Sequence, residues 1–369
     1  MVPQDLSCPN LRGIFFAQNQ CLEATVMKKF LKVLSAALAI STMALSLVGC
    51  KSNDDSNSNG SNPSDSGSRT ERLLKIGVVQ YAAHPSLDNC YNGIVKGLEE
   101  SEFAGKYEID LQNGQANAET CDAAAKKMVA ANYDMIFAIA TPAAVSTYAA
   151  AKDSDIPVIF CSVSDPVEAG LTASFDAGLE NCIGTSDVLD LEKQVNLIKT
   201  IQPDVKKLGV LYTTTEANSL SQLRTLKEVC SGVGIEVVEQ GVSGSADIPQ
   251  AAADLASKVD AINNFTDNNV VDNLSVLLEK ANDANVPVYG SEVEQVKNGC
   301  IASASIDYVE LGRKTALMGV DVLNGKKCSE MAVQIISDST LVVNEEVAER
   351  FGITLPESLS DAERVTTNA

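Results

Sequence analysis

Residues 75–88 read KIGVVQYAAHPSLD, and this stretch changes its pattern partway along. Ile76 to Val79 form a short apolar run, which is typical of a strand buried on both faces of a sheet. A helical pattern follows, with Pro85 suited to its first turn and Ser86 suited to cap it. A strand that feeds a helix through a polar loop forms a ligand-facing corner of an open α/β sheet, because backbone N–H groups and the positive end of the helix dipole point into the crevice there.

The same strand–loop–helix pattern recurs along the chain and predicts parallel sheets built from βαβ units. It restarts in the second half of the body, where LGVLYT at residues 208–213 resembles IGVVQY at residues 76–81. This weak repeat predicts an α/β protein of two similar, Rossmann-like lobes that face each other. In such proteins, ligands lie between the lobes at the carboxyl ends of the strands.

Composition limits the classes of function. The chain has 369 residues, of which 45% are hydrophobic and 5% aromatic, as suits a packed α/β protein of more than one domain. Its net charge of −21 argues against nucleic acid binding, since nothing would neutralise the phosphates. A single histidine excludes His-rich metal sites, and no GxGxxG or P-loop motif supports nucleotide binding. We therefore expect no metal and no cofactor.

The N-terminus has the pattern of an export signal. Residues 27–49 combine a basic start, MKKF, with an apolar run that ends in LVGC, which resembles the lipobox at which Cys50 of a bacterial lipoprotein is acylated. The alternative is a transmembrane anchor, but the run is short for a span. We expect a cleaved signal, a palmitate-type anchor on Cys50 and an extracytoplasmic protein held at the membrane. Residues 1–26 do not fit a signal peptide and indicate that translation starts at Met27.

Residues 50–72 consist mainly of Ser, Asn, Asp and Gly, which predicts a flexible tether. Seven cysteines follow between Cys90 and Cys328, at wide spacings and without a CxxC, so they form no zinc or redox motif. Cys161 and Cys300 lie in apolar runs and are expected to pack as small hydrophobic residues. An extracytoplasmic location allows a disulfide, but the sequence does not give the pairing.

A family resemblance rests on phrases that occur in order along the chain: VVQYAAHPSLDN (78–89), IFAIATPAA (136–144), VIFCSVSDPVEAGL (158–171), GVLYTTTEANSLSQL (209–223), FTDNNVV (265–271) and IDYVELGRKTALM (306–318). Together they resemble the tryptophan/tyrosine-type substrate-binding lipoproteins of bacterial ABC importers, over about residues 73–355. The resemblance implies a type I periplasmic-binding-protein fold, with a hinge crossed three times. We therefore expect lobe 1 to comprise residues 73–186 and 306–328, and lobe 2 to comprise residues 187–305 and 329–369. It also implies an aromatic amino acid as the ligand and ABC permease subunits as partners.

An amino acid needs donors for its carboxylate, acceptors for its ammonium and a wall for its side chain. Thr141, Pro142 and Ala143 open a helix and can form a carboxylate nest, although Thr141 can equally be a helix cap. Asp267 is the first candidate for the ammonium partner, with Phe265 beside it as an aromatic wall, and Asp307 is the second candidate. The full set of predicted ligand contacts is Tyr81, His84, Ser86, Thr141, Pro142, Ala143, Ser164, Asp165, Asn218, Ser219, Asp267, Asn268 and Asp307.

Three functions fit these observations. The first is a monomeric, lipid-anchored solute-binding protein that delivers a small molecule to an ABC permease. The second is a sensor of the same fold that signals to a membrane receptor. The third is an exported α/β enzyme, which is disfavoured because no GxSxG or Cys–His arrangement accompanies His84. We therefore expect a binding protein rather than an enzyme.

Overall fold

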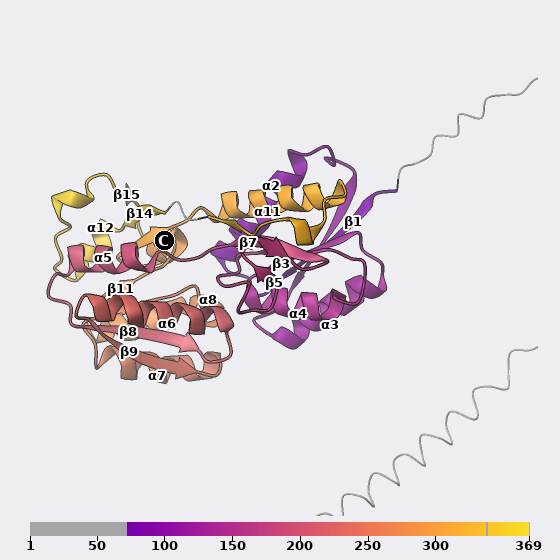
Figure 1. Cartoon of the computed structure of the whole chain (residues 1–369). Coiled ribbons are helices and arrows are strands. Elements are labelled where there is room, and N and C mark those ends of the chain that lie inside the picture. Colours follow the sequence, from indigo (N-terminus) through magenta and orange to yellow (C-terminus); the bar gives the residue numbers. More distant parts are fainter. Residues whose placement is uncertain (1–71, 337–338, 369) are drawn as a thin grey trace, which may run out of the picture. The chain divides into compact units, whose positions relative to one another are not determined.

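The computed structural model describes residues 72–336 and 339–368, which form an α/β protein with two parallel sheets (Figure 1). This confirms the fold class predicted from the sequence. The predicted signal, the lipidation site Cys50 and nearly all of the tether lie outside the described residues. Among the helices that the structure describes, none is both long enough and apolar enough to cross a membrane.

The lobe 1 sheet has the strand order β13-β7-β4-β3-β1-β2, and every pair in it is parallel. Its strands are β1 (Leu74–Gln80), β2 (Tyr107–Asn113), β3 (Met135–Ile139), β4 (Val158–Cys161), β7 (Cys182–Ser186) and β13 (Gln334–Ile335). The chain runs outward from β1 to β2 and then returns to β3 on the other side of β1. The direction of winding therefore reverses between β1 and β3, which is where ligands bind in open parallel sheets.

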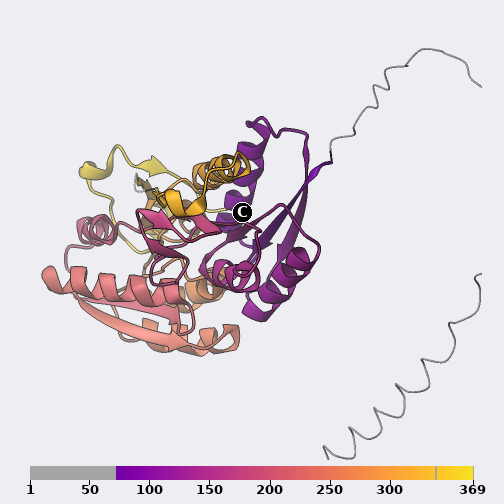
Figure 2. The same ribbon diagram turned by 45° about the vertical axis from the view of Figure 1, so that its right-hand side comes forward.

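Helices cover both faces of this sheet, as its continuous apolar strands require. Helices α2 (Pro85–Glu99) and α11 (Tyr308–Leu323) lie side by side on one face, and α3 (Ala118–Ala130) and α4 (Thr141–Ala151) lie on the other (Figures 1 and 2). Glycine allows α2 and α11 to pack closely: a Cβ added at Gly93 would lie 2.0 Å from the carbonyl oxygen of Val309. This packing fixes the start of α11 in lobe 1.

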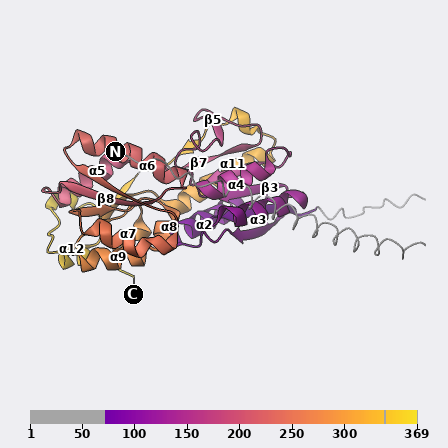
Figure 3. The same cartoon turned by 90° about the horizontal axis from the view of Figure 1, so that it is seen from below.

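The lobe 2 sheet repeats the arrangement with the order β11-β10-β8-β9, again all parallel. Its strands are β8 (Lys207–Thr213), β9 (Glu236–Val242), β10 (Ala261–Asn263) and β11 (Val288–Tyr289). Figure 3 shows α5 (Leu191–Ile201) and α6 (Ala217–Gly232) on one side of β8, with α7 (Ile248–Ala256) and α9 (Leu274–Asp283) on the other. The winding reverses between β8 and β10, so lobe 2 has a switch point equivalent to that of lobe 1.

Smaller elements complete the body. A third sheet pairs β14 (Thr340–Val343) with β12 (Ala302–Ser305) and β15 (Glu363–Arg364), and β5 (Thr172–Ser174) pairs with β6 (Ala177–Gly178). The remaining helices are α8 (Asn268–Asp272), α10 (Val293–Lys297) and α12 (Glu345–Arg350), and short 3-10 turns occur at residues 245–247, 328–330 and 357–359. The sequence pattern did not predict α10, β15 or the β5–β6 pair, because each is too short to show a period.

The expected end of lobe 1 at residue 328 is wrong. Strand β13 pairs with β7 in the lobe 1 sheet, and Met331 and Val333 pack into the lobe 1 core. The return segment therefore stays with lobe 1 up to Ile336. An apolar run reveals a strand but not the sheet edge that the strand joins.

Two helices, rather than one, occupy residues 268–283, because Asn273 separates α8 from α9. Its side-chain amide donates to the carbonyl oxygen of Asn269 at 2.8 Å, which is the kind of local bond by which asparagine competes with a continuous helix. All seven cysteines between Cys90 and Cys328 are buried, and none of them is in a disulfide within the described part of the chain.

Candidate ligand-binding site

A cavity lies where the strand ends of the two lobes meet. Its empty volume is about 330 Å³, part of which is open to solvent. Both switch points contribute to its wall, since α2 and α4 begin at it from lobe 1 and α6 and α8 begin at it from lobe 2. Six of the predicted ligand contacts line it: His84, Ser86, Thr141, Ser164, Asn218 and Asn268.

Two hydroxyl groups of lobe 1 face this cavity without a partner. Ser86 lies in the first turn of α2 and Thr141 begins α4, and both hydroxyls are buried with no hydrogen bond. The N-caps are His84 and Ala140, so Ser86 does not cap its helix as predicted. An unpaired buried hydroxyl costs free energy, which makes it available to a ligand acceptor. With the positive ends of α2 and α4, these hydroxyls make a site for an anion.

The backbone beside these hydroxyls is held in an unusual conformation. Ala140 has φ 77° and Ser162 has φ 59°, and they follow β3 and β4 respectively. Both residues line the cavity. Non-glycine residues with positive φ cost on the order of 1–3 kcal/mol and gather at ligand sites, where the surrounding structure holds them. The ends of β3 and β4 therefore present strained backbone to the cavity.

Asp187, directly after β7, places a carboxylate in the wall of the cavity. It is almost fully buried and accepts three hydrogen bonds from hydroxyls: Ser162 at 2.8 Å, Tyr308 at 3.1 Å and Ser164 at 3.2 Å. Burial raises the pKa of Asp187 above its ordinary value, and the three hydroxyls oppose that rise. All four residues line the cavity, so this cluster can accept a ligand cation.

Glu292 brings a second buried carboxylate to the cavity from lobe 2. It caps α10, where its two oxygens accept from the backbone N–H groups of Glu294 at 2.7 Å and Gln295 at 2.9 Å. Burial raises the pKa of Glu292 to about 7, and these two bonds and the neighbouring Ser86 hydroxyl oppose that rise. Its oxygens therefore already have fixed backbone partners, in contrast to the rotatable hydroxyls around Asp187.

The single histidine lies in the cavity wall, and both of its ring nitrogens are buried and unpaired. Burial lowers the pKa of His84 to about 4, while the neighbouring Asn268 side chain and Asp88 oppose that fall. The ring is therefore neutral at pH 7, with one nitrogen as donor and the other as acceptor. Such a ring can hydrogen-bond to a ligand or stack on it.

The lobe 2 wall is organised by Glu216, which caps α6 and which the sequence did not single out. Its Oε2 accepts from the side-chain amides of Asn218 at 3.1 Å and Asn268 at 2.7 Å. Backbone N–H groups donate to both of its oxygens, from Asn268 to Oε2 and from Asn269 to Oε1, each at 3.1 Å. Glu216 itself is outside the cavity lining and acts on the wall through the two asparagines.

Asp267 lies behind the wall, which contradicts its prediction as the ammonium partner. Its carboxylate accepts from the Thr213 backbone N–H at 2.6 Å, the Thr213 hydroxyl at 2.8 Å, the Ser219 hydroxyl at 2.7 Å and the Val270 N–H at 3.0 Å. It caps α8. Because Ser219 donates to Asp267, it too is absent from the lining, and Phe265 packs in the lobe 2 core.

Three further predicted contacts belong to the scaffold of lobe 1. The Tyr81 hydroxyl donates to the carbonyl oxygen of Ala116 at 2.9 Å, and Tyr81 packs in the core. Ala143 packs in the same core, and Pro142 occupies the first turn of α4. None of these three residues lines the cavity. They belong to the strand end and helix start that carry Thr141 and His84.

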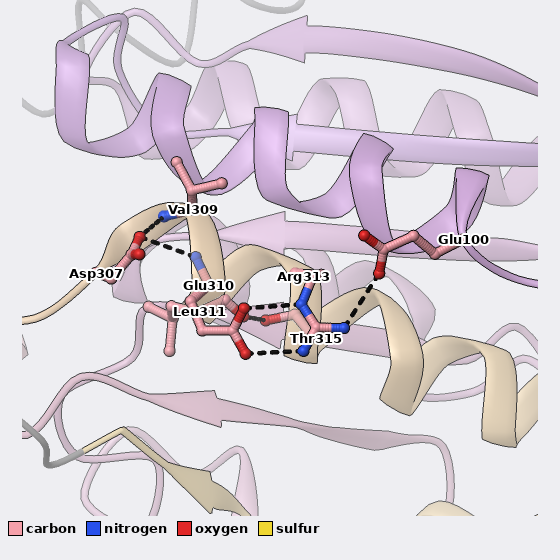
Figure 4. A network of polar contacts seen from close by, with 7 residues as sticks. All are labelled: Glu100, Asp307, Val309, Glu310, Leu311, Arg313 and Thr315. Atoms are coloured by element: carbon pink, nitrogen blue, oxygen red, sulfur yellow. Dashed lines mark hydrogen bonds and ion pairs between the residues drawn. The ribbon is translucent and has the colours of Figure 1, made fainter.

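Asp307, the second candidate for the ammonium partner, caps α11 (Figure 4). It is exposed and accepts from the backbone N–H groups of Val309 at 2.9 Å and Glu310 at 3.0 Å. Figure 4 also shows Arg313, which bonds Glu310 on its own helix and reaches Glu100 at the end of α2, at 3.2 Å. Asp307 therefore starts the helix that brings Tyr308 to the cavity and contacts no part of the cavity itself.

Asp165 was predicted to contact the ligand, but it contacts lobe 2 instead. Its carboxylate accepts from the Ser221 hydroxyl on α6 at 3.4 Å. Nearby, Arg224 of α6 pairs with Glu168 of lobe 1 at 2.6 Å. These contacts join the two lobes directly, so they belong to a closed arrangement of the cleft.

Sequence reasoning missed Glu216 behind the cavity wall and three functional candidates in it: Asp187, Glu292 and Tyr308. Asp187 and Glu292 each follow a strand end, which is the signal that identified the other corners. Tyr308 follows Asp307, the capping residue of α11, and the sequence pattern favours Asp307 instead.

Comparison with known proteins places these observations in a family. Residues 75–366 match the model of the ABC transporter substrate binding proteins. The chain is 36% identical to a tyrosine-binding protein of Clostridioides difficile (strain R20291), over 87% of this chain and 92% of that protein.

Two solved structures show the same fold in different states. A protein from Streptococcus pneumonia in complex with L-Trp is 34% identical, with a TM-score of 0.77 over 79% of this chain and 99% of the other. A ligand-free, open substrate binding protein with adhesive properties from Clostridium difficile is 36% identical, with a TM-score of 0.62 over 80% and 100%. The body is thus closer in shape to the ligand-bound relative, which agrees with the contacts between its lobes.

The family is one of solute-binding proteins, not enzymes, and the resemblance seen in the sequence is confirmed. The chain belongs to the ABC transporter substrate-binding proteins of type I periplasmic-binding fold.

Proposed function

We propose that the protein is a lipid-anchored, extracytoplasmic solute-binding protein that captures an aromatic amino acid and delivers it to an ABC permease. One observation carries the ligand class. Unpaired hydroxyls at two helix N-termini, on Ser86 and Thr141, share one cavity with the buried carboxylate of Asp187. Donors on one part of the wall and an anion on another are complementary to a zwitterion.

In this proposal, Ser86, Thr141 and the N-termini of α2 and α4 hold the ligand carboxylate. Asp187 holds the ammonium, which needs an anionic partner because it leaves water when it binds beside this buried carboxylate. The hydroxyls around Asp187 can rotate to keep their own bonds as the ammonium arrives. The apolar side chains of Leu87 and Val271, together with the His84 ring, provide the wall for the ligand side chain.

The aromatic class is supported by the relatives, of which one is named for tyrosine and one was solved with L-Trp. Isothermal titration with tryptophan, tyrosine, phenylalanine and leucine tests it directly. We expect saturable, one-to-one binding of at least one aromatic amino acid to a monomer, and weaker binding of leucine. Native mass spectrometry of protein purified from rich medium should show the same ligand retained unaltered. Binding of none of the aromatic amino acids, or chemical conversion of one, would reject the proposal.

Anchoring at Cys50 is supported by the LVGC pattern and by the tether of residues 50–72 that follows it. We expect Cys50→Ala protein to lack acyl chains by mass spectrometry and to leave the membrane fraction. Cys90→Ala serves as the matched control and should remain anchored. A Cys50→Ala protein that is still acylated would disprove this assignment. Co-purification of the anchored protein with a permease, or with a receptor kinase, distinguishes transport from sensing.

A further inference from the structure

Glu216 lies just behind the ligand wall and holds two residues of that wall. Its Oε2 accepts from the Nδ2 groups of Asn218 and Asn268, at 3.1 and 2.7 Å. Both asparagines line the cavity, whereas Glu216 does not. Glu216 is almost fully buried, so water does not compete for these bonds.

The chemistry of Glu216 fixes which atom of each asparagine faces it. A carboxylate only accepts hydrogen bonds, so each side-chain amide must turn its nitrogen toward Glu216 and its oxygen away. The Nδ2 group of Asn218 also donates to the carbonyl oxygen of Thr266, at 3.1 Å. The Oδ1 of Asn218 is left buried without any hydrogen-bond partner. An unpaired acceptor in a cavity wall matches a ligand donor.

A neutral amide cannot replace this carboxylate. Backbone N–H groups donate to both oxygens of Glu216, from Asn268 and from Asn269, each at 3.1 Å. An amide at this position has one oxygen and one N–H₂ group, so one backbone N–H would face another donor. Burial and the neighbouring Asp267 raise the pKa of Glu216 to about 7, so it is mainly ionised at pH 8.

We propose that Glu216 is a positioning residue that keeps the side-chain oxygens of Asn218 and Asn268 toward the cleft, and thereby selects ligands with an N–H or O–H donor at that wall. This inference rests on the proposed function, because it assumes an amino acid in the cavity. The donor is either the ammonium or a polar group of the side chain, such as a phenol O–H or an indole N–H. The two sources share the same chemistry and can be separated with a ligand panel.

A double-mutant cycle at pH 8 tests whether Glu216 acts through the wall. Titration calorimetry with the best aromatic ligand compares Glu216→Gln, Asn218→Leu and the double variant. We expect each single change to weaken binding by about ten- to hundred-fold, as for loss of a hydrogen bond to a charged group. The double variant should lose little more than the larger single loss, because both changes remove the same contact. The inference would be overturned if the double variant lost affinity by the product of the two single losses. It would also be overturned if folded Glu216→Gln bound the ligand with unchanged affinity.

A ligand panel identifies the donor and separates positioning from a general structural defect. If the ammonium is the donor, Glu216→Gln should weaken tyrosine, tryptophan and phenylalanine alike, but not 3-(4-hydroxyphenyl)propionate, which lacks the amine. If the side chain is the donor, tyrosine or tryptophan should weaken and phenylalanine should not. An equal loss for every ligand, the deaminated one included, would overturn the inference. If Glu216→Gln does not fold, the same panel with Asn218→Leu decides between these outcomes.

Asn344→Ala is the matched control for stability. Asn344 is buried and caps α12 by accepting from the Val347 N–H at 3.1 Å, and it is not part of the cavity wall. It should lower the melting temperature without changing affinity. Failure of the wild-type protein to bind any aromatic amino acid would refute the proposed function. Uniform losses in variants of a protein that does bind would refute only the role of Glu216.

Discussion

Replacement of Asp187 by asparagine tests the centre of the proposed site. The side chain keeps its size and loses its charge. Its three hydrogen-bond partners are the hydroxyls of Ser162, Ser164 and Tyr308, which can rotate to accept from the new amide. The fold should therefore tolerate the change, and the measured effect should report on the ligand ammonium.

The expected loss of affinity follows from burial. Asp187 is almost fully buried, so an ammonium beside it is removed from water and depends on this carboxylate. Truncating one partner of a buried, hydrogen-bonded charge pair costs about 2–5 kcal/mol. That corresponds to about thirty-fold to several thousand-fold in the dissociation constant.

Stability should change in the opposite direction. Because burial raises the pKa of Asp187, the ionised form is disfavoured in the folded, ligand-free protein. A neutral asparagine removes that penalty, so the melting temperature without ligand should stay equal or rise. Loss of binding without loss of stability distinguishes a ligand contact from a structural residue.

Titration calorimetry of Asp187→Asn against the wild type measures the affinity, and thermal unfolding measures the stability. Asp307→Asn is the matched control, since this exposed carboxylate caps α11 and lies outside the cavity wall. It should bind as the wild type does, and asparagine is also a good helix cap. A folded Asp187→Asn protein with unchanged affinity would refute this reasoning and make Glu292 the next candidate.

Three other predictions follow from the same geometry. Thr141→Val should weaken amino acid binding by about ten- to hundred-fold in calorimetry, because the ligand carboxylate loses a charged hydrogen bond; equal affinity would remove Thr141 from the site. Arg224→Gln should weaken binding only about two- to five-fold, because its ion pair with Glu168 is exposed. Small-angle scattering should show a larger fraction of open protein, and Glu168→Gln should have the same effect. A larger loss of affinity would show that Arg224 does more than pair with Glu168. The ligand-free protein should become less stable as pH rises from about 4.5 to 7. The pKa values of Glu216 and Glu292 are raised to about 7, so over this range the folded protein holds protons on these two groups that the unfolded chain releases. The lowered pKa of His84 acts in the opposite direction, but it involves only one group. A melting temperature that rises across this range would contradict the last prediction.

The sequence predicted the corners of the site because their signals are local. A buried apolar strand followed by a polar residue and a helix start can be read from a dozen residues, and this located His84, Ser86 and Thr141. The doubly wound order of the strands then brings these corners together at the switch point between β1 and β3. The boundary of lobe 1 at Ile336 was missed for the converse reason, since the partner of β13 lies far away in sequence.

The choice among carboxylates could not be made locally, because several acidic residues follow strand ends. Asp267 and Asp187 both do so, yet only Asp187 reaches the cavity. The difference lies in their donors. Asp267 accepts from two backbone N–H groups, whose positions are fixed by the fold, and from two hydroxyls. Its role is therefore structural.

The other residues that donate to Asp187 all do so through side-chain hydroxyls, and a hydroxyl can rotate and become an acceptor when a cation arrives. A carboxylate bound by fixed donors is committed to the fold, whereas one bound by rotatable donors remains available to a ligand. By this criterion Glu292, which accepts from two backbone N–H groups, ranks below Asp187 although both line the cavity. The ammonium should therefore bind beside the hinge, at the cluster that joins the ends of β4 and β7 to the start of α11.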